Sequence, residues 1–559
     1  MKNILLSLIL FLLFASNCCS QSWVWEKTAG TGGGYGRSVT VDATGNAFVT
    51  GALYNPSITF GNTTLTNAGS SIVFVAKYDG TGHALWAKSA GGTDNNGGNS
   101  ISADPNGNVY ATGYYINTSI TFDAVTLSNS GNADAFIVKY DGDGNVQWAR
   151  SIGGSGVETG YCASVDAGGN IFIIGSFSSA VISIGSFTLN NSDPSGTTSD
   201  AFIAKYNSSG TLMWAQSVGG VNDDYGRGVS ADAHGNVFIT GYFNSPTVTI
   251  SSTTIANDSV GTNDAFIIKC ASNGNVLWAK TIVGGGNDAG ASVSVDAGGN
   301  AFVTGGFSSS SITLGTNTLV NASAGTDDIF VAKYGVNGNV LWAKRAGDIG
   351  DDYGISLSSD LNGSVFVTGG FSIYTPSITF DATTLTPANY SGCVAGPCDP
   401  MFIVQYDANG NVLCGSALQS GSDDRNAVCA GASGNAYLTG DFDANYFILG
   451  ADTFHTTIGD EFFIAKYSGA GGLGVNEVHA ANFVTIYPNP STGIFGITIR
   501  NVRAETKICV RDVLGNCVLD KGSVKNENQE IDLSKEAPGI YFVEVIAGNT
   551  RNVKKILVK

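Results

Sequence analysis

The stretches ASVSVDAGGNAFVTGGF (291–307) and DIFVAKYGVNGNVLWAKRAG (328–347) contain the pattern that decides the fold. Apolar and polar residues alternate in four short runs, at 292–296, 300–307, 328–334 and 339–344, which is typical of half-buried β-strands. The Asn337-Gly338 dipeptide predicts a tight turn between the last two strands, because such a turn needs residues that tolerate positive φ. The DxxGN sequence at Asp296 is expected to cap the turn between the first two.

Each part of this pattern occurs seven times, at a spacing of about 65 residues. A large tryptophan in each unit is expected to pack between units, and the seventh position has Cys414 instead. The DxxGN turn has Gly431 as its seventh member, and in F[IV]xKY Gln405 replaces one Lys and Cys270 one Tyr. The three series are Trp25, Trp86, Trp148, Trp214, Trp278 and Trp342; Asp42, Asp104, Asp166, Asp232, Asp296 and Asp360; and Phe74, Phe136, Phe202, Phe266, Phe330, Phe402 and Phe463.

The phase of the repeat indicates how the chain closes. It begins with a fourth strand at Trp25, before any first strand, and the seventh unit ends with its third strand at Tyr467. If the Trp25 strand completes the seventh unit, every sheet has four strands and no edge is left free. We therefore expect an all-β fold: a seven-bladed β-propeller of four-stranded blades over residues 21–467.

These units resemble the SBBP-type β-propeller repeat of bacterial secreted proteins, DxxGNxxVTGxF followed by FVAKYxxxGxxxWAK, over about residues 23 to 467. The resemblance implies a propeller and an extracellular role. It implies no particular activity.

The last 80 or so residues have a different pattern of about six short strands with Pro and Gly turns. The segments YPNPSTGIFGITI (487–499), VRDVLGNCVL (510–519) and IDLSKEAPGIYFVEV (531–545) are followed by a basic last strand. In this order they resemble the type A sorting domain of the type IX secretion system of Bacteroidetes. This resemblance implies an Ig-like β-sandwich at 479–559 after a linker at 468–478, and it names the outer-membrane translocon and its sorting peptidase as partners. An ordinary Ig-like adhesive module is the alternative. The matching residues are Tyr487, Pro488, Asn489, Pro490, Gly493, Gly515, Pro538, Gly539 and Tyr541.

The N-terminus has the order of a secretory signal: Lys2, an apolar run from Ile4 to Ala15, and small residues up to a cleavage site after Ser20. The apolar run is too short to cross a bilayer, and no transmembrane segment is predicted in the mature chain. In an oxidising compartment three cysteine pairs are candidate disulfides, while Cys162 and Cys270 have no evident mate. The pairs are Cys393 with Cys398, Cys509 with Cys517, and Cys414 with Cys429 on consecutive predicted strands.

Charge excludes some classes of partner. The whole chain has a net charge of −18, and from Gln21 to Gly474 there are 15 Lys and Arg against 36 Asp and Glu. Such a surface repels phosphate backbones, so nucleic acids and anionic membranes are poor partners. We expect a secreted protein, at the outer-membrane surface or outside the cell.

The predicted ligand-binding surface is the face that collects the long loops between successive units and between second and third strands. Loops on a rigid scaffold commonly bind ligands, and carboxylates at glycine loops suit Ca²⁺, so a glycan held through calcium, or a surface protein, is the expected partner. Acidic loops that serve solubility alone are the alternative. The candidate residues are Asp94, Asp223, Asp224, Asp288, Asp351, Asp352, Asp423 and Asp424.

No catalytic constellation is predicted. The four histidines have no evident nucleophile partner, and the propeller arginines fall at mostly different phases of the repeat, unlike a sialidase cluster. The sequence therefore favours a binding or adhesion module. A polysaccharide lyase or hydrolase that uses carboxylates on the loop face, and a structural envelope component, remain alternatives.

Overall fold

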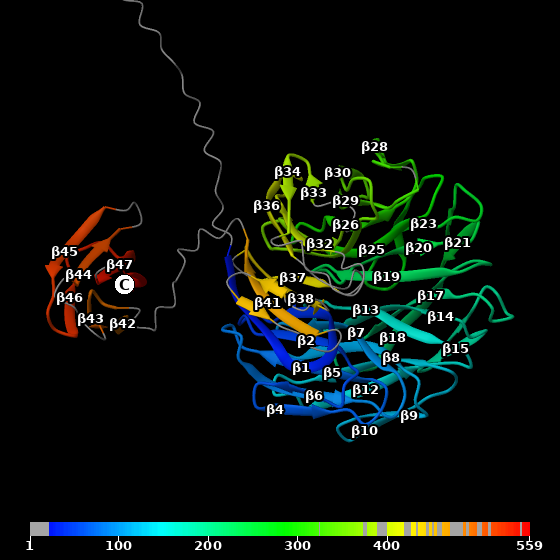
Figure 1. Cartoon of the computed structure of the whole chain (residues 1–559), viewed down its shortest axis with the longest axis horizontal. Coiled ribbons are helices and arrows are strands. Elements are labelled where there is room, and N and C mark those ends of the chain that lie inside the picture. Colours follow the sequence, from blue (N-terminus) through cyan, green and yellow to red (C-terminus); the bar gives the residue numbers. More distant parts are fainter. Residues whose placement is uncertain are drawn as a thin grey trace, which may run out of the picture. The chain divides into compact units, whose positions relative to one another are not determined.

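Antiparallel strands joined by turns and loops form the described part of the computed structural model, and no α-helix occurs in it. The chain divides into two compact units, Met1–Ala470 and Gly471–Lys559. The first is propeller-like, with small sheets arranged around a centre (Figure 1). The structure describes residues 22–323, 325–372, 377–387, 400–418, 426–431, 434–442, 447–449, 452–454, 461–469, 484–487, 491–499, 506–512, 516–547 and 550–558.

The innermost strand of each sheet contacts the innermost strand of the next, and the last of them, β37, contacts β1. We call these the inner strands. They are β1 (Ser22–Val41), β7 (Asn96–Ala103), β13 (Glu158–Val165), β19 (Asp224–Ala231), β25 (Asp288–Val295), β31 (Tyr353–Ser359) and β37 (Ala427–Ala430).

Three further strands complete each sheet in the order that the sequence predicts. The second strands are β2 (Ala47–Leu53), β8 (Val109–Tyr115), β14 (Ile171–Phe177), β20 (Val237–Phe243), β26 (Ala301–Phe307), β32 (Val365–Gly370) and β38 (Asn435–Phe442). The third are β5 (Ile72–Tyr78), β11 (Asp134–Tyr140), β17 (Asp200–Tyr206), β23 (Asp264–Cys270), β29 (Asp328–Tyr334), β35 (Met401–Tyr406) and β41 (Glu461–Ser468). The fourth are β6 (Ala84–Ala90), β12 (Val146–Ile152), β18 (Leu212–Val218), β24 (Val276–Ile282), β30 (Val340–Ala346) and β36 (Val412–Leu418).

The sheet of β37, β38 and β41 takes its fourth strand from the other end of the chain. The first part of β1 pairs with β41, with Trp23 opposite Tyr467, and the second part pairs with β2, with Val39 opposite Val49. In Figure 1 the blue β1 accordingly lies beside the orange β41. The pairing expected for the Trp25 strand is present.

The connections between second and third strands, expected only as connectors, are themselves two-stranded hairpins. Their apolar residues, such as Ile312 and Leu314, are buried in the clusters between neighbouring sheets. The hairpins are β3 (Ser57–Phe60) with β4 (Thr63–Thr66), β9 (Ser119–Phe122) with β10 (Val125–Ser128), β15 (Val181–Ile184) with β16 (Phe187–Asn190), β21 (Thr247–Ile250) with β22 (Thr253–Ala256), β27 (Ser311–Leu314) with β28 (Asn317–Val320), β33 (Ile378–Phe380) with β34 (Thr383–Leu385), and β39 (Phe447–Leu449) with β40 (Asp452–Phe454).

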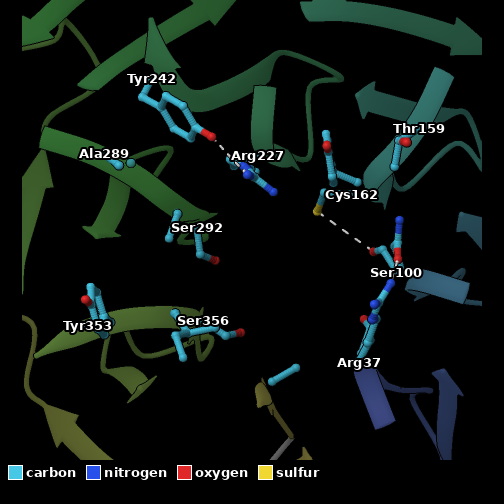
Figure 2. Close-up of a pocket in the computed structure, with 18 of the residues that line it drawn as sticks. Arg37, Ser100, Thr159, Cys162, Arg227, Tyr242, Ala289, Ser292, Tyr353 and Ser356 are labelled. Carbon is cyan, nitrogen blue, oxygen red and sulfur yellow. Dashed lines mark hydrogen bonds between the residues drawn. The ribbon is translucent and has the colours of Figure 1, made fainter. Parts of the chain in front are cut away.

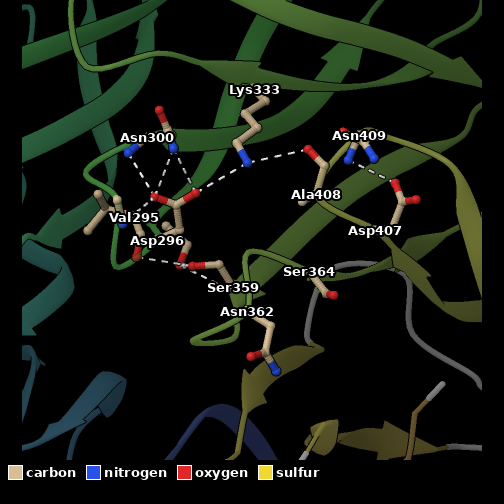
Figure 3. Close-up of polar contacts among 12 residues, drawn as sticks. Val295, Asp296, Asn300, Lys333, Ser359, Asn362, Ser364, Asp407, Ala408 and Asn409 are labelled. Carbon is tan, nitrogen blue, oxygen red and sulfur yellow. Dashed lines mark hydrogen bonds and ion pairs between the residues drawn. The ribbon is translucent and has the colours of Figure 1, made fainter. Parts of the chain in front are cut away.

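The DxxGN aspartates cap the turns between first and second strands, as expected. Asp296 Oδ1 accepts hydrogen bonds from the backbone N–H groups of Gly298 and Asn300, both at 2.9 Å. Its Oδ2 lies 3.2 Å from Lys333 Nζ, and both side chains are nearly inaccessible. Figure 3 shows that Lys333 also reaches Ala408, in the turn between β35 and β36 of the next sheet. One aspartate therefore closes its own turn and anchors a lysine that joins two sheets.

The second unit contains two sheets, ordered β42-β43-β46 and β45-β44-β47-β48. One hydrophobic cluster includes residues of both, among them Ile497 and Val543. Of the sorting-motif residues, Gly493 has a φ of 110°, and Tyr541 Oη donates to the carbonyl oxygen of Ala537. Pro488, Asn489, Pro490 and Gly515 lie outside the described residues. The strands are β42 (Val484–Tyr487), β43 (Ile494–Ile499), β44 (Lys507–Arg511), β45 (Cys517–Ser523), β46 (Asn528–Asp532), β47 (Gly539–Ala547) and β48 (Thr550–Val558).

Candidate functional site

A cavity of about 1100 Å³ lies where the inner strands converge. All seven inner strands contribute to its wall: β1 with Arg37 and Ser38 near its end, the next five with residues near their starts, and β37 with Ala427, which follows Asn426. Ile116, Asn132, Asn287 and other residues of the loops between units and between second and third strands complete the wall. The cavity therefore lies toward the face on which the sequence predicted ligand binding.

A β-bulge in each of six inner strands directs one residue of that strand toward this cavity. In β1 the pairing with β2 shifts between Gly36 and Ser38, so Arg37 is the extra residue. A bulge bends the strand and redirects the side chain of its extra residue. All the extra residues line the cavity, and we call them the bulge residues: Arg37, Asn99, Tyr161, Arg227, Ala291 and Ile355.

The residues on either side of each bulge residue hold the scaffold together. The preceding glycine packs against the neighbouring sheet, and a β-carbon at Gly290 would collide with Thr240 Oγ1. The serine after the bulge commonly reaches the next inner strand: Ser100 Oγ accepts a hydrogen bond from Ala163 N at 3.1 Å, and Ser292 Oγ from Leu357 N at 3.2 Å. Recurrent packing contacts thus flank a position whose own side chain varies from unit to unit.

The bulge residues differ in character around the cavity. Four consecutive inner strands, β1, β7, β13 and β19, present Arg37, Asn99, Tyr161 and Arg227, which we call the cationic arc. The next two present Ala291 and Ile355. Figure 2 shows Arg37 on the same side as Ser100 and Cys162, with Ser292, Ser356 and Tyr353 across from them.

The two arginines of the arc are positioned by neutral groups. Arg227 Nη2 donates to Tyr242 Oη at 3.0 Å, and its guanidinium carbon lies 4.5 Å from the ring centre of Tyr161. Arg37 Nη1 donates to Asn99 Oδ1, and its guanidinium lies over Tyr35. Among the described residues neither arginine has a carboxylate within ion-pair distance.

Sequence reasoning missed this pair. Most propeller arginines do fall at different phases of the repeat, but Arg37 and Arg227 share one, the residue after the glycine that begins the bulge. The signal that could have found them is the glycine six residues before each turn aspartate, as with Gly36 and Asp42 or Gly226 and Asp232. The residue that follows this glycine changes character from unit to unit. Arg425 lies outside the described residues.

The acidic residues predicted to bind ligand do not line the cavity. Asp224 and Asp288 begin inner strands, and Asp352 immediately precedes one. All three are fully buried and hold the connection that follows the second strand. Asp224 Oδ2, for example, accepts hydrogen bonds from Ser245 Oγ at 2.8 Å and Gly220 N at 2.7 Å. Burial raises the pKa of each of the three carboxyls to about 7.

Three other predicted aspartates are exposed in loops. Asp94 accepts a hydrogen bond from Asn117 Nδ2 at 3.1 Å, Asp223 from Ser199 N at 2.9 Å, and Asp351 from Asp327 N at 3.0 Å. Asp423 and Asp424 lie outside the described residues. Within the described ranges, no three His, Cys, Asp or Glu side chains come together in a way that could hold a metal ion.

The cysteines that the structure describes are thiols. The Sγ atoms of Cys509 and Cys517 lie 2.8 Å apart on neighbouring strands. Cys414 lies on β36 and Cys429 on β37 of the next sheet, while Cys393 and Cys398 are outside the described residues. In the part of the chain that the structure describes, no helix is long and apolar enough to span a bilayer.

The C-terminal unit matches a known family. Residues 485–559 match the model described as a secretion system C-terminal sorting domain. This match indicates that the chain is exported to the cell surface or secreted by the type IX system.

The larger unit has more distant relatives. An uncharacterized WD repeat-containing protein of Acanthamoeba polyphaga mimivirus is 24% identical over 440 residues, which is 64% of this chain and 31% of that protein. The chain thus spans about a third of the length of this curated relative. Among solved structures, a polysaccharide lyase described as a PL25 ulvan lyase is 10% identical, with a TM-score of 0.35, over 75% of this chain and 92% of the other. PorZ, a type IX secretion component of Porphyromonas gingivalis, is 11% identical, with a TM-score of 0.14, over 96% of this chain and 100% of the other. Likenesses this weak say nothing about what the chain binds.

Proposed function

We propose that this chain is an exported binding module, a closed propeller of seven four-stranded blades whose ligand site is the cavity between the inner strands. The cycle of inner-strand contacts from β1 to β37 and back supports the closed ring, as does the double pairing of β1. The unit is of the SBBP type, preceded by a signal peptide at 1–20 and followed by an Ig-like sandwich that serves as the sorting domain.

The observation that carries a binding role is the contrast at the bulges. Glycine precedes all six bulge residues and packs against the neighbouring sheet, and serine follows four of them, whereas the bulge residues range from Arg to Ala. A scaffold whose packing glycine recurs while the residue next to it, which faces a cavity, varies is suited to recognition. The cavity is at the upper end of the size range of small-molecule sites and has tyrosines and several amide and hydroxyl groups in its wall.

A glycan array probed with the mature full-length chain tests this proposal. The matched pair of variants is Ala291→Trp, which places an indole in the cavity, and Val260→Trp, at a loop position that is 91% exposed. We expect the wild type and V260W to bind the same glycans and A291W to lose them. Running the array with calcium and again with chelator tests whether the exposed aspartates of the loop face hold a cation.

Each other outcome favours a different function. Binding that A291W leaves unchanged would move the site out of the cavity. Turnover of a bound polysaccharide would establish the lyase or hydrolase alternative. An array that stays blank, with self-association of the chain, would favour a structural envelope component and contradict the proposal.

The sorting role has its own test. A chain that ends at residue 484 lacks the matched domain. In a host with type IX secretion, we expect this truncated chain to accumulate in the periplasm. A periplasmic reporter fused to residues 471–559 is the matched gain-of-function arm. A reporter that stays in the periplasm would contradict the assignment.

A further inference from the structure

The charge of the cavity is opposite to that of the unit that contains it. The chain has a net charge of −18, and several of its cations are paired with carboxylates, as Lys88 is with Asp123 and Lys344 with Asp381. Arg37 and Arg227 are not paired in this way within the described residues, although both line the cavity. Two arginines and one carboxylate, Asp327, in the wall of one cavity leave uncompensated positive charge, which is unfavourable unless an anion completes the site.

The arginines are held with part of their donor capacity free. A guanidinium has five N–H donors, and the hydrogen bonds of Arg227 to side chains use one of them, at Tyr242 Oη. Stacking over Tyr161 at 4.5 Å fixes the plane of the group and leaves its edge available. A planar guanidinium edge matches a carboxylate or a sulfate ester, which it binds through two parallel hydrogen bonds.

The rest of the wall fits a sugar better than a simple anion. Tyr114, Tyr161, Tyr242 and Tyr353 offer aromatic faces with hydroxyl groups, and Asn132 and Asn287 offer amide groups. Aromatic faces pack against the C–H faces of pyranose rings, while amides and hydroxyls bond their hydroxyl groups. A volume of about 1100 Å³ is enough for several sugar units.

Carboxylates on the loops around the cavity limit how much negative charge a ligand can carry. Asp94, Asp223 and Asp351 are exposed on the loops of the same face, and Asp327 lines the cavity away from the cationic arc. These carboxylates repel a densely charged polymer such as a nucleic acid. They are compatible with a short oligosaccharide that has few charged sugars and whose acidic groups contact the cationic arc.

Resting on the proposed cavity site, we infer that the ligand is an acidic oligosaccharide, whose uronate carboxylates or sulfate esters are bound by Arg37 and Arg227 and whose sugar rings pack on the cavity tyrosines. This assigns the cationic arc as the part of the site that selects acidic over neutral sugars. The apolar side at Ala291 and Ile355 contributes shape rather than charge.

The test measures affinity of the mature full-length chain for matched ligand pairs. The probes are oligogalacturonate with its methyl ester, and a sulfated galactan oligosaccharide with its desulfated form. We expect at least one acidic member to bind about tenfold or more tightly than its neutral partner, and to weaken as salt rises because the contact is ionic. The carboxylate pair and the sulfate pair separate the two acid types.

Variants locate the effect. Arg37→Gln and Arg227→Gln should each cost about tenfold or more in affinity for the acidic probe. Arg150→Gln is the matched control, because Arg150 lies on an outer strand, where its Nε donates to the Gly210 carbonyl. Arg227→Lys keeps the charge and loses the planar fork, so it should retain folding, which a thermal melt checks, and only part of the affinity.

The failures of the two proposals are distinguishable. Equal binding of acidic and neutral members, with R37Q and R227Q unchanged but A291W inactive, would overturn the acidic ligand and leave the cavity site standing. Absence of binding by every probe would overturn the acidic ligand. If A291W also binds array glycans like the wild type, the cavity site fails as well.

Discussion

The indole Nε1 of Trp25 donates a hydrogen bond to the carbonyl oxygen of Gly80, 3.0 Å away. Trp25 belongs to the part of β1 that pairs with β41, and Gly80 lies in the turn between β5 and β6, in the next sheet. The same contact joins five other neighbouring pairs of sheets, at 3.0–3.1 Å: Trp86 to Gly142, Trp148 to Ser208, Trp214 to Ser272, Trp278 to Val336 and Trp342 to Ala408. The junction between the two ends of the unit thus uses the same contact as junctions within the chain.

Trp25→Ala should therefore destabilise the whole propeller-like unit. Trp25 is 7% exposed and packs between Tyr78 and Tyr437, so its removal leaves a cavity as well as an unpaired carbonyl. We expect a loss of about 3–5 kcal/mol in the free energy of unfolding, measured by urea denaturation. Val24→Ala, at a neighbouring side chain that is 47% exposed, is the control and should change stability by about 0.5 kcal/mol or less. Equal midpoints for the two variants would argue against closure through β1.

Closure of the ring through β1 also explains why two positions, Gln405 and Cys414, depart from the repeat. In five other sheets a lysine of the third strand and the tryptophan of the fourth reach the same turn in the next sheet, as Lys77 and Trp86 both reach Gly142. The sheet that follows the one containing β35 and β36 has β41 as its third strand and β1 as its fourth. These two strands come from opposite ends of the chain, so no turn joins β41 to β1. Gln405 and Cys414 stand at the lysine and tryptophan positions that would face this turn.

The strands and their order were predictable because the repeat presents each pattern seven times. The residues of the proposed site were not predictable in this way, because they do not repeat. Gly226 recurs at the same position in five other units, whereas Arg227 is replaced by other residues in most of them. The burial of three of the acidic residues was not predictable for a related reason. Position in a loop says nothing about side-chain direction, and Asp224 turns inward to hold Ser245 rather than outward to a ligand.

The buried pair of Lys333 and Asp296 should contribute more to stability than an exposed pair does. Both side chains are about 7% exposed or less, so Lys333→Ala leaves a buried carboxylate without its cation. We expect a cost of about 3 kcal/mol in the free energy of unfolding. Lys344→Ala is the matched control, since Lys344 and Asp381 lie 2.9 Å apart but are 30% and 40% exposed; its expected cost is about 1 kcal/mol or less. Equal costs would mean that the lysine stem, and not the ion pair, carries the effect.

Five buried aspartates, at the starts of third strands and at or just before the starts of inner strands, should make the propeller-like unit less stable as pH rises. Their pKa values are raised from 3.8 by burial, so the folded state binds more protons than the unfolded state between these values. The resulting stability is fully present below about pH 4 and is lost as pH rises through 6 and 7. We expect the melting temperature to fall by several degrees from pH 5 to pH 8. The groups are Asp200 and Asp264, at about 6, and Asp224, Asp288 and Asp352, at about 7.

One sheet supplies the control for this titration. At the position of Asp224 the second sheet has Asn96, which donates to Asn117 Oδ1 at 2.7 Å, where Asp224 accepts from Ser245. The double substitution D224N/S245N copies this neutral pair. We expect it to fold and to reduce the loss of stability between pH 5 and pH 8, because one titrating carboxyl has been removed. A pH profile identical to that of the wild type would show that Asp224 does not hold a proton in this range.

Substitution of two adjacent residues of β25 should affect different properties: stability at Gly290 and ligand affinity at Ala291. A β-carbon at Gly290 would collide with Thr240 Oγ1, which is itself fixed by a 2.7 Å hydrogen bond to the Phe266 carbonyl, so Gly290→Ala forces two sheets apart. We expect it to cost about 1–3 kcal/mol in the free energy of unfolding. Ala291→Ser, one residue on, faces the cavity and should leave the thermal melt unchanged while altering ligand affinity. If A291S destabilises as much as G290A, the bulge residue is part of the packing, and the separation of scaffold from site would be wrong.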